Sequence, residues 1–421
     1  MTRQPGATAD GCPLSRRELL SGLSLSLLSA PRRARAGEEV RVGLERVEAE
    51  AGGFLRGRRA GLLVHSASVT AGGRHAIDVL RGVGVDVVRL FGPEHGLRGE
   101  AAAGDRVADG IDGKTGLPVV SLYGERHAPS PADLAGLDVL VVDLQDAGVR
   151  FYTYVSTVLL CLEPAAAAGV EIVVLDRPNP LGGEKMSGPE RDASRPFRLV
   201  SVAPGPLVHG LTLGEMTRLA NRSRAAPARV RVVPLEGWTR AMTWPDTART
   251  WVAPSPNLRT AEAALVYPGT CLLEGTNLSE GRGTEAPFLL LGAPWMRPEA
   301  VAREAASSGV VLEPSTFTPT ASAAAPQPKH EGASCAGVRV RVTDPGAVRP
   351  YAFGLTLLAA LRRLHPQFAW LGDGSALDSL LGTGSVRTAL DRDEPVESIL
   401  AADRPGIERF AARRRDTLLY C

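Results

Sequence analysis

Six short apolar runs, rich in valine and leucine, constrain the fold more than any other feature of this sequence. They span residues 61–65, 85–91, 118–122, 139–144, 172–175 and 230–233. Each run is closed by glycine, proline or charged residues, and segments of helical length separate them. The runs are continuous rather than alternating, as in parallel strands covered by helices on both faces. The pattern predicts an α/β domain with a Rossmann-like, doubly wound, mostly parallel sheet.

The connecting segments at residues 75–81, 154–168 and 213–220 carry helical patterning. Thr212 and Glu215 have the spacing of a capping box for the last of them. The chain has 421 residues, more than the roughly 250–300 beyond which single cores rarely grow. We therefore expect the sheet domain at residues 37–263 and a smaller α+β domain at 264–421, with a strand at 338–342 and a helix at 353–364. The segment 297–337, rich in Ala, Ser, Thr and Pro, is interpreted as a wrapping loop of the second domain.

The first 36 residues resemble a twin-arginine export signal. Arg16 and Arg17 precede an apolar run at 19–30, and residues 34–36 read Ala-Arg-Ala, a small-x-small cleavage site. The run is about half of the roughly 20 residues that span a bilayer, so we expect export to the periplasm or beyond and no stable membrane insertion afterwards. The segment holds six arginines against two acids, so its removal takes the net charge from +2 to −2. That balance does not indicate a nucleic-acid partner.

The sequence lacks the common cofactor and nucleophile motifs. No GxGxxG follows the first predicted strand, and neither GxxxxGK nor GxSxG occurs, so the sheet does not imply NAD, ATP or an esterase-type serine. CxxC and HExxH are also absent and the seven histidines are scattered, so we expect no metal and no cofactor. Whether Cys271 and Cys335 form a disulfide stays open.

Polar side chains follow three of the predicted strands. In open α/β sheets the ligand crevice lies beyond the carboxyl ends of the strands, so these side chains are candidates for one site. They are Glu94, His95 and Arg98 after the run 85–91, Asp146, Arg150 and Tyr152 after 139–144, and Asp176 and Asn179 after 172–175.

A fourth candidate segment, YPGTCLLEGTNLSEGRGTEAPF, covers residues 267–288. It brings together Glu274, Glu280 and Glu285, with only Arg282 to offset them. Interleaved glycines allow sharp turns that direct several carboxylates into one space. Apolar residues on both sides predict a site loop that is fixed against a core.

With these motifs the chain resembles the NamZ-type exo-β-N-acetylmuramidase family. The resemblance rests on FGPEHGLRG, DLQDAGVRFYTY, LDRPNPLGG, LTLGEMTRLAN, APSPNL and the 267–288 segment, and it spans nearly the whole chain after the signal. It implies a Rossmann-like domain, a smaller C-terminal domain and an active cleft between them. It also implies release of β-linked N-acetylmuramic acid from the non-reducing end of peptidoglycan fragments.

Glycoside hydrolysis generally needs one carboxylic acid to protonate the leaving oxygen and a second group at the anomeric carbon. Glu94 is our candidate for the acid, because it follows Pro93 in a rigid turn where partial removal from water favours a protonated carboxyl. Glu280 is favoured as the second group, with Glu285 and Asp146 as alternatives. We expect Glu274 to orient its neighbours.

Substrate binding is expected from other polar residues of the same clusters. The lactyl carboxylate of muramic acid calls for an arginine, and the candidates are Arg282, Arg150 and Arg98. Asn277 would contact hydroxyl or acetamido groups, Tyr152 would stack on the sugar, and His95 would position Glu94. Two alternatives stay open: Arg150 pairs with Asp146, and Asp176 and Asn179 only lock their turn.

A non-catalytic muropeptide-binding protein is the alternative function. A pure binder of an anionic sugar gains nothing from several carboxylates around its ligand. The acidic clusters therefore favour an enzyme.

Overall fold

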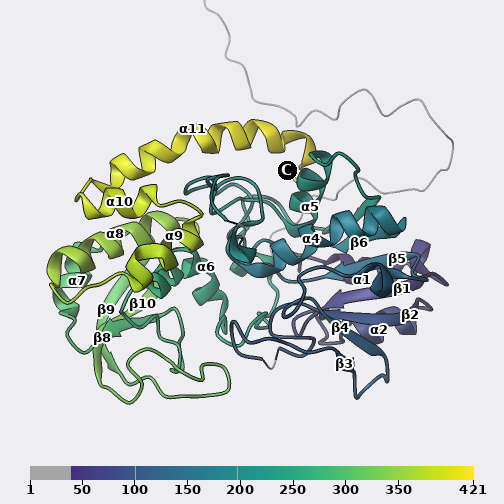
Figure 1. The fold of residues 1–421 in the computed structure, drawn as a ribbon, viewed down its shortest axis with the longest axis horizontal. Coiled ribbons are helices and arrows are strands. Elements are labelled where there is room, and N and C mark those ends of the chain that lie inside the picture. The colour runs from purple at the N-terminus through teal and green to yellow at the C-terminus, as the bar shows by residue number, and fades with distance from the viewer. Residues whose placement is uncertain (1–38, 100, 197) are drawn as a thin grey trace, which may run out of the picture.

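The computed structural model describes residues 39–99, 101–196 and 198–421, so the export signal expected at 1–36 lies outside it. Figure 1 shows two lobes, each built around a β-sheet. The N-terminal lobe holds seven strands in the order β3-β4-β2-β1-β5-β6-β7, and the C-terminal lobe holds three in the order β8-β10-β9.

The N-terminal sheet confirms the predicted doubly wound fold. Its strands are β1 (Arg59–Val64), β2 (Asp86–Gly92), β3 (Gly110–Ile111), β4 (Pro118–Ser121), β5 (Val139–Asp143), β6 (Glu171–Leu175) and β7 (Val230–Val233). All neighbours pair in parallel except β3, which is antiparallel to β4. Only β3 was not predicted, because two exposed residues carry no apolar signal.

Helices cover both faces of this sheet, which explains its continuous apolar strands. They are α1 (Gly43–Ala49), α2 (Ala76–Gly82), α3 (Pro131–Leu134), α4 (Thr153–Ala168) and α5 (Leu213–Arg222). Leu140 and Val142 of β5 belong to the core cluster that contains α4, whereas Val139 and Val141 belong to the cluster that contains α1 and α2. The capping box is confirmed, since the Thr212 hydroxyl accepts from the Glu215 N–H at 3.2 Å and Glu215 Oε2 accepts from the Thr212 N–H at 3.1 Å.

The C-terminal lobe packs helices on a small antiparallel sheet. Its elements are α6 (Ala261–Thr270), β8 (Leu290–Ala293), α7 (Pro298–Glu304), β9 (Val310–Phe317), β10 (Cys335–Val342), α8 (Pro350–Leu364), α9 (Ser375–Leu381), α10 (Ser385–Asp391) and α11 (Val396–Arg414). Helices α6 and α8 cross so closely that a Cβ on Gly269 would lie 2.1 Å from the Pro350 carbonyl oxygen. Glycine is therefore required at that crossing.

One prediction for this lobe was wrong. The segment 297–337 is not a single wrapping loop, because it contains α7, β9 and the start of β10, and residues 318–334 are its longest irregular stretch. Val310, Leu312 and Phe317 are buried in β9, which pairs along its whole length with β10. The Ala, Ser, Thr and Pro content concealed this strand.

Short 3₁₀ segments complete the lobes. They are η1 (Gly53–Leu55), η2 (Leu199–Ser201), η3 (Trp244–Thr247), η4 (Cys271–Gly275), η5 (Leu371–Gly374) and η6 (Arg415–Thr417). Cys271 and Cys335 are free thiols, which answers the question of a disulfide between them. Over the described ranges, no helix is long and apolar enough to cross a bilayer.

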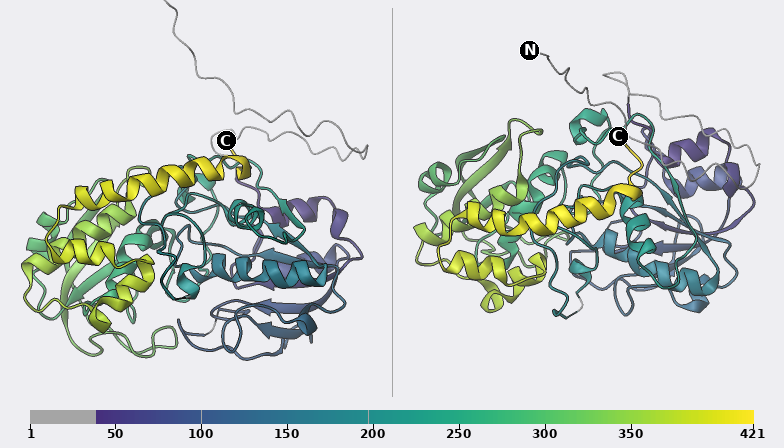
Figure 2. Two further views of the ribbon diagram at one scale, coloured as in Figure 1. Left: turned by 45° about the horizontal axis from the view of Figure 1, so that its top comes forward. Right: turned by 90° about the horizontal axis from the view of Figure 1, so that it is seen from above.

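Helix α11 links the two lobes. It runs from the C-terminal lobe across the molecule to the N-terminal lobe (Figures 1 and 2). Beyond it, the Tyr420 hydroxyl donates to Asp176 Oδ2 at 2.5 Å and accepts from the Leu235 N–H at 3.0 Å. The Tyr420 ring lies edge-on to Trp238, with centroids 5.0 Å apart. The last residues of the chain thus pack into the N-terminal lobe.

Candidate active site

A cavity of about 640 Å³ lies where the two lobes meet. The N-terminal lobe contributes the turns after β2 and β5 and residues near Asn257. The C-terminal lobe contributes the segment 267–288 and the loop residues 324–329. Two of the predicted polar clusters and the glycine-rich segment therefore do share one hollow.

Glu94 lies on the N-terminal side of this cavity and is 9% exposed. Strand β2 ends at Gly92, and Pro93 then sets the turn that directs the side chain. Glu94 Oε1 accepts from the Gly104 N–H at 2.9 Å, and Oε2 accepts from the Thr153 hydroxyl at 2.6 Å. A carboxyl oxygen has two acceptor sites, and the Tyr123 phenol also hydrogen-bonds this carboxyl, so one acceptor site is left for a ligand. Within the described part of the chain, no ion pair involves Glu94.

His95 and Tyr123 flank Glu94 in the cavity wall. His95 has a left-handed backbone with φ of 70°, and its Nδ1 lies 2.8 Å from the Ala101 carbonyl oxygen. Burial lowers the pKa of His95, so the imidazole is neutral near pH 7 even though the Glu94 carboxylate opposes that shift. Burial and the nearby Glu94 charge raise the pKa of Tyr123, which keeps its phenol protonated.

Glu280 occupies the opposite side of the cavity in a different electrostatic setting and is 3% exposed. Its Oε1 lies 3.2 Å from Arg282 Nε, and its Oε2 lies 3.0 Å from Lys329 Nζ. Arg282 Nη2 also donates to Glu274 Oε1 at 2.6 Å. Burial alone would lower the pKa of Arg282, but Glu274 and Glu280 raise it above its usual value. Glu280 thus lies between two cations.

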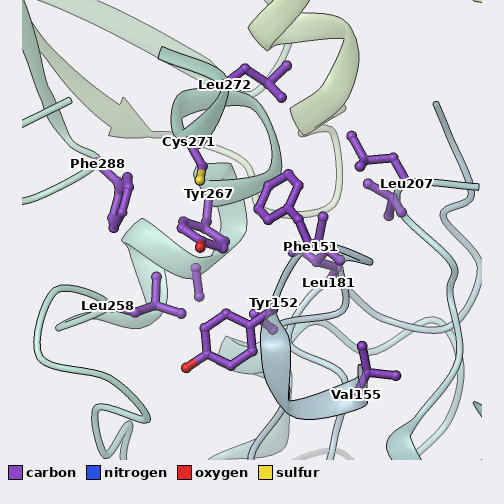
Figure 3. Close-up of a cluster of buried hydrophobic side chains, with 14 of the residues drawn as sticks. Phe151, Tyr152, Val155, Leu181, Leu207, Leu258, Tyr267, Cys271, Leu272 and Phe288 are labelled. Carbon is purple, nitrogen blue, oxygen red and sulfur yellow. The ribbon is translucent and has the colours of Figure 1, made fainter. Parts of the chain in front are cut away.

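Aromatic side chains from both lobes form the apolar wall. Figure 3 shows Phe151, Tyr152, Tyr267 and Phe288 gathered in one cluster. Tyr267 lies edge-on to Phe151 and to Phe288, with centroid distances of 5.4 and 4.7 Å. Tyr152 packs edge-on against Tyr154 at 4.8 Å, and its hydroxyl makes no hydrogen bond of good geometry with any described residue. Rigid rings of this kind suit the apolar face of a sugar.

The comparisons with known proteins decide the family. The family description "Exo-beta-N-acetylmuramidase NamZ, N-terminal" matches residues 60–262, and its C-terminal counterpart matches residues 265–420. The chain belongs to the NamZ family.

Related proteins cover most of the length of this chain. The peptidoglycan β-N-acetylmuramidase NamZ of Bacillus subtilis is 40% identical over 371 residues, which cover 87% of this chain and 88% of that protein. Two solved DUF1343 family structures from Bacteroides fragilis have TM-scores of 0.83 and 0.73 at 28% and 30% identity. They cover 92% and 91% of this chain, and it covers 100% and 99% of theirs.

Two alternative carboxylates of this NamZ family member lie away from the cavity. Glu285 points outward with a side chain 73% exposed, and its Oε1 lies 3.4 Å from Arg339. Asp146 is buried behind the wall, where Oδ2 accepts from the Gly148 N–H at 2.8 Å and lies 3.7 Å from His209 Nε2. Burial raises the pKa of Asp146 to about 7. Neither is retained as a catalytic candidate.

Two of the three arginines considered for the lactyl carboxylate have other partners. Arg150 is fully buried and donates to the carbonyl oxygens of Pro189 at 2.8 Å, Gly205 at 2.7 Å and Leu381. It therefore neither lines the cavity nor pairs with Asp146. Arg98 donates to Asp112 Oδ1 at 2.7 Å, also outside the cavity.

Three further candidates serve the backbone instead of a ligand. Asp176 accepts from the Thr212 hydroxyl at 2.6 Å and the Gly214 N–H at 2.9 Å. Asn179 donates to the Leu211 carbonyl oxygen at 2.9 Å and accepts from the Leu181 N–H at 2.9 Å, so Asn179 locks its turn, whereas Asp176 fixes the start of α5. Asn277, expected to bind substrate, instead donates to the Gln367 carbonyl oxygen at 2.7 Å and accepts from the Ala369 N–H at 3.0 Å.

Several polar cavity residues were not predicted, among them Tyr123, Thr153, Asn257 and Lys329. Asn257 Nδ2 donates to the Ala324 carbonyl oxygen at 2.7 Å, which leaves Oδ1 without a partner among the described residues. Thr153 and Asn257 do lie within DLQDAGVRFYTY and APSPNL, two of the motifs that carried the family resemblance. Lys329 lies in the polar loop and gave no signal.

Proposed function

We propose that this NamZ family member is a glycoside hydrolase that releases β-linked N-acetylmuramic acid from the non-reducing end of peptidoglycan fragments. The Bacillus subtilis relative, named a peptidoglycan β-N-acetylmuramidase, supports the substrate class. One structural observation supports the chemistry. Two carboxyl groups in unlike settings face one cavity, since Glu280 lies between two cations and Glu94 has none.

In this proposal Glu94 is the general acid. It gives a proton to the glycosidic oxygen as the bond to the anomeric carbon breaks and both bonding electrons go to that oxygen. Glu280, held as an anion, stabilises the positive charge that develops at the anomeric carbon. Water then supplies a hydroxyl to this carbon and a proton to the Glu94 carboxylate, which restores the acid and completes hydrolysis.

Arg282 is proposed to recognise the lactyl carboxylate. It uses Nη2 on Glu274 and Nε on Glu280, which leaves Nη1 for the ligand. The Arg282 guanidinium also lies 5.1 Å from the centroid of Phe288, so its plane is held by the aromatic wall. Tyr152 is the proposed ring contact for the sugar, and His95 supports the Glu94 turn.

The test compares two substrates that differ only in the leaving group. We expect Glu94→Gln to lower kcat on a muramyl disaccharide by about 10²–10⁴-fold. The loss on a nitrophenyl β-N-acetylmuramide is expected to be much smaller, because nitrophenolate leaves without protonation. Glu280→Gln should lower both rates alike, since its role does not depend on the leaving group.

Glu285→Gln is the matched control, and both of its rates should equal those of the wild type. Full disaccharide hydrolysis by Glu94→Gln would remove Glu94 from its role. Tight binding of muramic acid by the wild type, with no release from either substrate, would instead support the non-catalytic binding protein.

We also infer that the chain is exported to the periplasm or beyond. Support comes from Arg16 and Arg17 ahead of the apolar run 19–30 and the Ala-Arg-Ala site at 34–36. Replacing both arginines by lysine should leave the precursor in the cytoplasm, as followed by cell fractionation. Removal of the signal from this variant at the wild-type rate would contradict export through a twin-arginine signal.

A further inference from the structure

The loop between β9 and β10, residues 318–334, closes one side of the cavity. It is fixed at points that belong to both lobes. The Thr320 N–H donates to the Gly283 carbonyl oxygen at 2.9 Å, and Asn257 of the N-terminal lobe donates to the Ala324 carbonyl oxygen at 2.7 Å. The His330 ring lies 2.8 Å from the Asn277 carbonyl oxygen. The loop is thus a built wall rather than a free surface segment.

Lys329 is the cation that this loop brings to the cavity. Its Nζ lies 2.8 Å from the Leu273 carbonyl oxygen, 2.9 Å from that of Leu278 and 3.0 Å from Glu280 Oε2. The ammonium donates to three backbone carbonyl oxygens, the third being that of Glu274 at 3.4 Å. Its contact with Glu280 Oε2 is an ion pair, because that oxygen has no hydrogen bond of good geometry among the described residues. The position of the charge is therefore set by the backbone on both sides of Glu274 and not by Glu280 alone.

The charges in this corner balance only when Lys329 is present. Arg282 faces both Glu274 and Glu280, so one cation would serve two carboxylates if Lys329 were absent. Glu280 is 3% exposed, and a carboxylate with so little contact with water takes up a proton when its cation is lost. Lys329 offsets that tendency.

We propose that Lys329 is a positioning residue for the hydrolytic reaction, which holds a cation beside Glu280 and so keeps that carboxylate ionised and aligned. This inference rests on the proposed role of Glu280. Lys329 does not touch the reacting atoms. It acts through Glu280, and it makes the reactive state of that carboxylate depend on a segment about 50 residues further along the chain.

Few other groups around Glu280 can change charge near neutral pH. The charged and titratable groups of the cavity wall on its own side are Arg282, Glu274, Lys329, Tyr267 and Cys271, and those across the cavity are Glu94, His95, Asp105 and Tyr123. Burial raises the pKa of both Tyr267 and Cys271, so these stay neutral. Burial lowers the pKa of His95, which is neutral as well.

The test is the pH profile of kcat/KM on the nitrophenyl muramide, which does not depend on leaving-group protonation. For Lys329→Met we expect the acid limb to move up by about 1–3 pH units, the size of a lost charge partner. Activity well below the new limb should then fall by about 10–10³-fold and recover as the pH rises. Lys329→Arg keeps the charge, so its acid limb should stay in place while kcat falls, because a planar fork does not fit the three oxygens.

Lys185→Met is the matched control. Lys185 is also half-buried and donates to a backbone carbonyl, that of Pro345 at 2.8 Å, but it lies outside this cavity. Its profile should equal that of the wild type. An equal loss at every pH for Lys329→Met, with no movement of the limb, would overturn the proposal and leave Lys329 a structural residue.

The outcomes also separate this inference from the proposed function. If Glu280→Gln is inactive while Lys329→Met has a wild-type profile, only the role of Lys329 fails. If Glu280→Gln is fully active, the role of Glu280 fails first. Should Lys329→Met not fold, a displaced acid limb in Lys329→Arg would still contradict the proposal.

Discussion

At the scale of single residues, hydrogen-bond partners separate ligand-binding side chains from structural ones. Arg150 gives its donors to three backbone carbonyl oxygens, two from residues 189–205 and one from Leu381 in the other lobe. Arg282 gives its donors to carboxylates in the cavity wall. Both arginines lie in segments that also carry acidic residues, Asp146 for one and Glu280 for the other, and their hydrogen-bond partners distinguish them.

Arg150→Met should be severely destabilising without affecting substrate recognition. It removes the partner of three buried carbonyl oxygens, each worth about 1–3 kcal/mol when left unpaired. We expect the free energy of unfolding in urea to fall by about 3–5 kcal/mol, comparable to the loss of one partner of a buried ion pair. KM for the muramide should stay within about twofold of wild type in whatever protein remains folded.

Arg98→Met is the control for this loss. Arg98 pairs at a partly exposed site with Asp112, and such pairs contribute about 0–1 kcal/mol. A large rise in KM for Arg150→Met at unchanged stability would return Arg150 to the list of substrate-binding residues.

The sequence predicted well which residue types line the cavity, but it predicted poorly where an individual side chain points. Glu94, Glu280 and Arg282 do line the cavity, because strand ends and glycine-rich turns point polar groups toward a crevice. Asn277 has the same residue-level signal, yet its amide bonds to the backbone near residue 368, about 90 positions away. No local pattern reveals a partner at that separation.

At the scale of elements, the predictions succeeded for strands that are buried on both faces of the sheet. The parallel strands of the N-terminal lobe show continuous apolar runs since both faces are covered, and α8 shows a clear helical stripe. Strand β9 was missed because only Val310, Leu312 and Phe317 are buried, at positions that do not alternate regularly, and Glu, Pro, Ser and Thr lie between the last two. Its composition does not predict a strand, and its pairing with β10 along the whole length stabilises it instead.

Two buried carboxyl groups, one after β5 and one after β6, should make stability depend on pH. Burial raises the pKa of Asp146 to about 7 and that of Asp176 to about 6, from an ordinary value of 3.8. Between about pH 4 and pH 7 these two carboxyls therefore bind more protons in the native state than in the unfolded chain, so their contribution to stability falls as pH rises. Asp146→Asn removes one of these two contributions. Over that pH range the melting temperature of the variant should therefore rise relative to that of the wild type as the pH increases.

Calorimetry from pH 4 to pH 8 checks this slope. Asp86→Asn is the control, because Asp86 is half-exposed at the start of β2 and its replacement should leave the slope unchanged. A slope for Asp146→Asn equal to that of the wild type would show that the buried carboxyl does not hold its proton in the native state.

At the scale of the whole molecule, the cavity exists only while both lobes keep their relative position. Glu94 belongs to one lobe and Glu280 to the other, so a small rotation of the lobes would separate the two proposed catalytic groups. Helix α11 and the tail after it connect the lobes on the side shown at the top of Figure 1. The sequence did not indicate this connection, because Tyr420 meets Asp176 across 244 positions.

Deleting residues 416–421 should therefore weaken catalysis as well as stability. The tail supplies the Tyr420 hydroxyl to Asp176 and Leu235, and its backbone bonds Glu215 and Arg240 at 2.9 Å each. Tyr420→Phe removes only the hydroxyl, so we expect a loss of about 1–3 kcal/mol in unfolding free energy with unchanged kcat/KM. The deletion frees the end of α11, and we expect kcat/KM to fall at least tenfold at a temperature where the protein is still folded.

Glu408→Gln, an exposed change on α11, is the control and should alter neither quantity. Small-angle scattering of the deletion variant should show a larger radius of gyration that muramic acid reverses, because a ligand held by both lobes restores their closure. Wild-type kcat/KM in the deletion variant, measured alongside a lowered melting temperature, would mean that the tail only stabilises the N-terminal lobe. The alignment of Glu94 with Glu280 would then depend on the cavity walls themselves, through contacts such as that of Asn257 with Ala324.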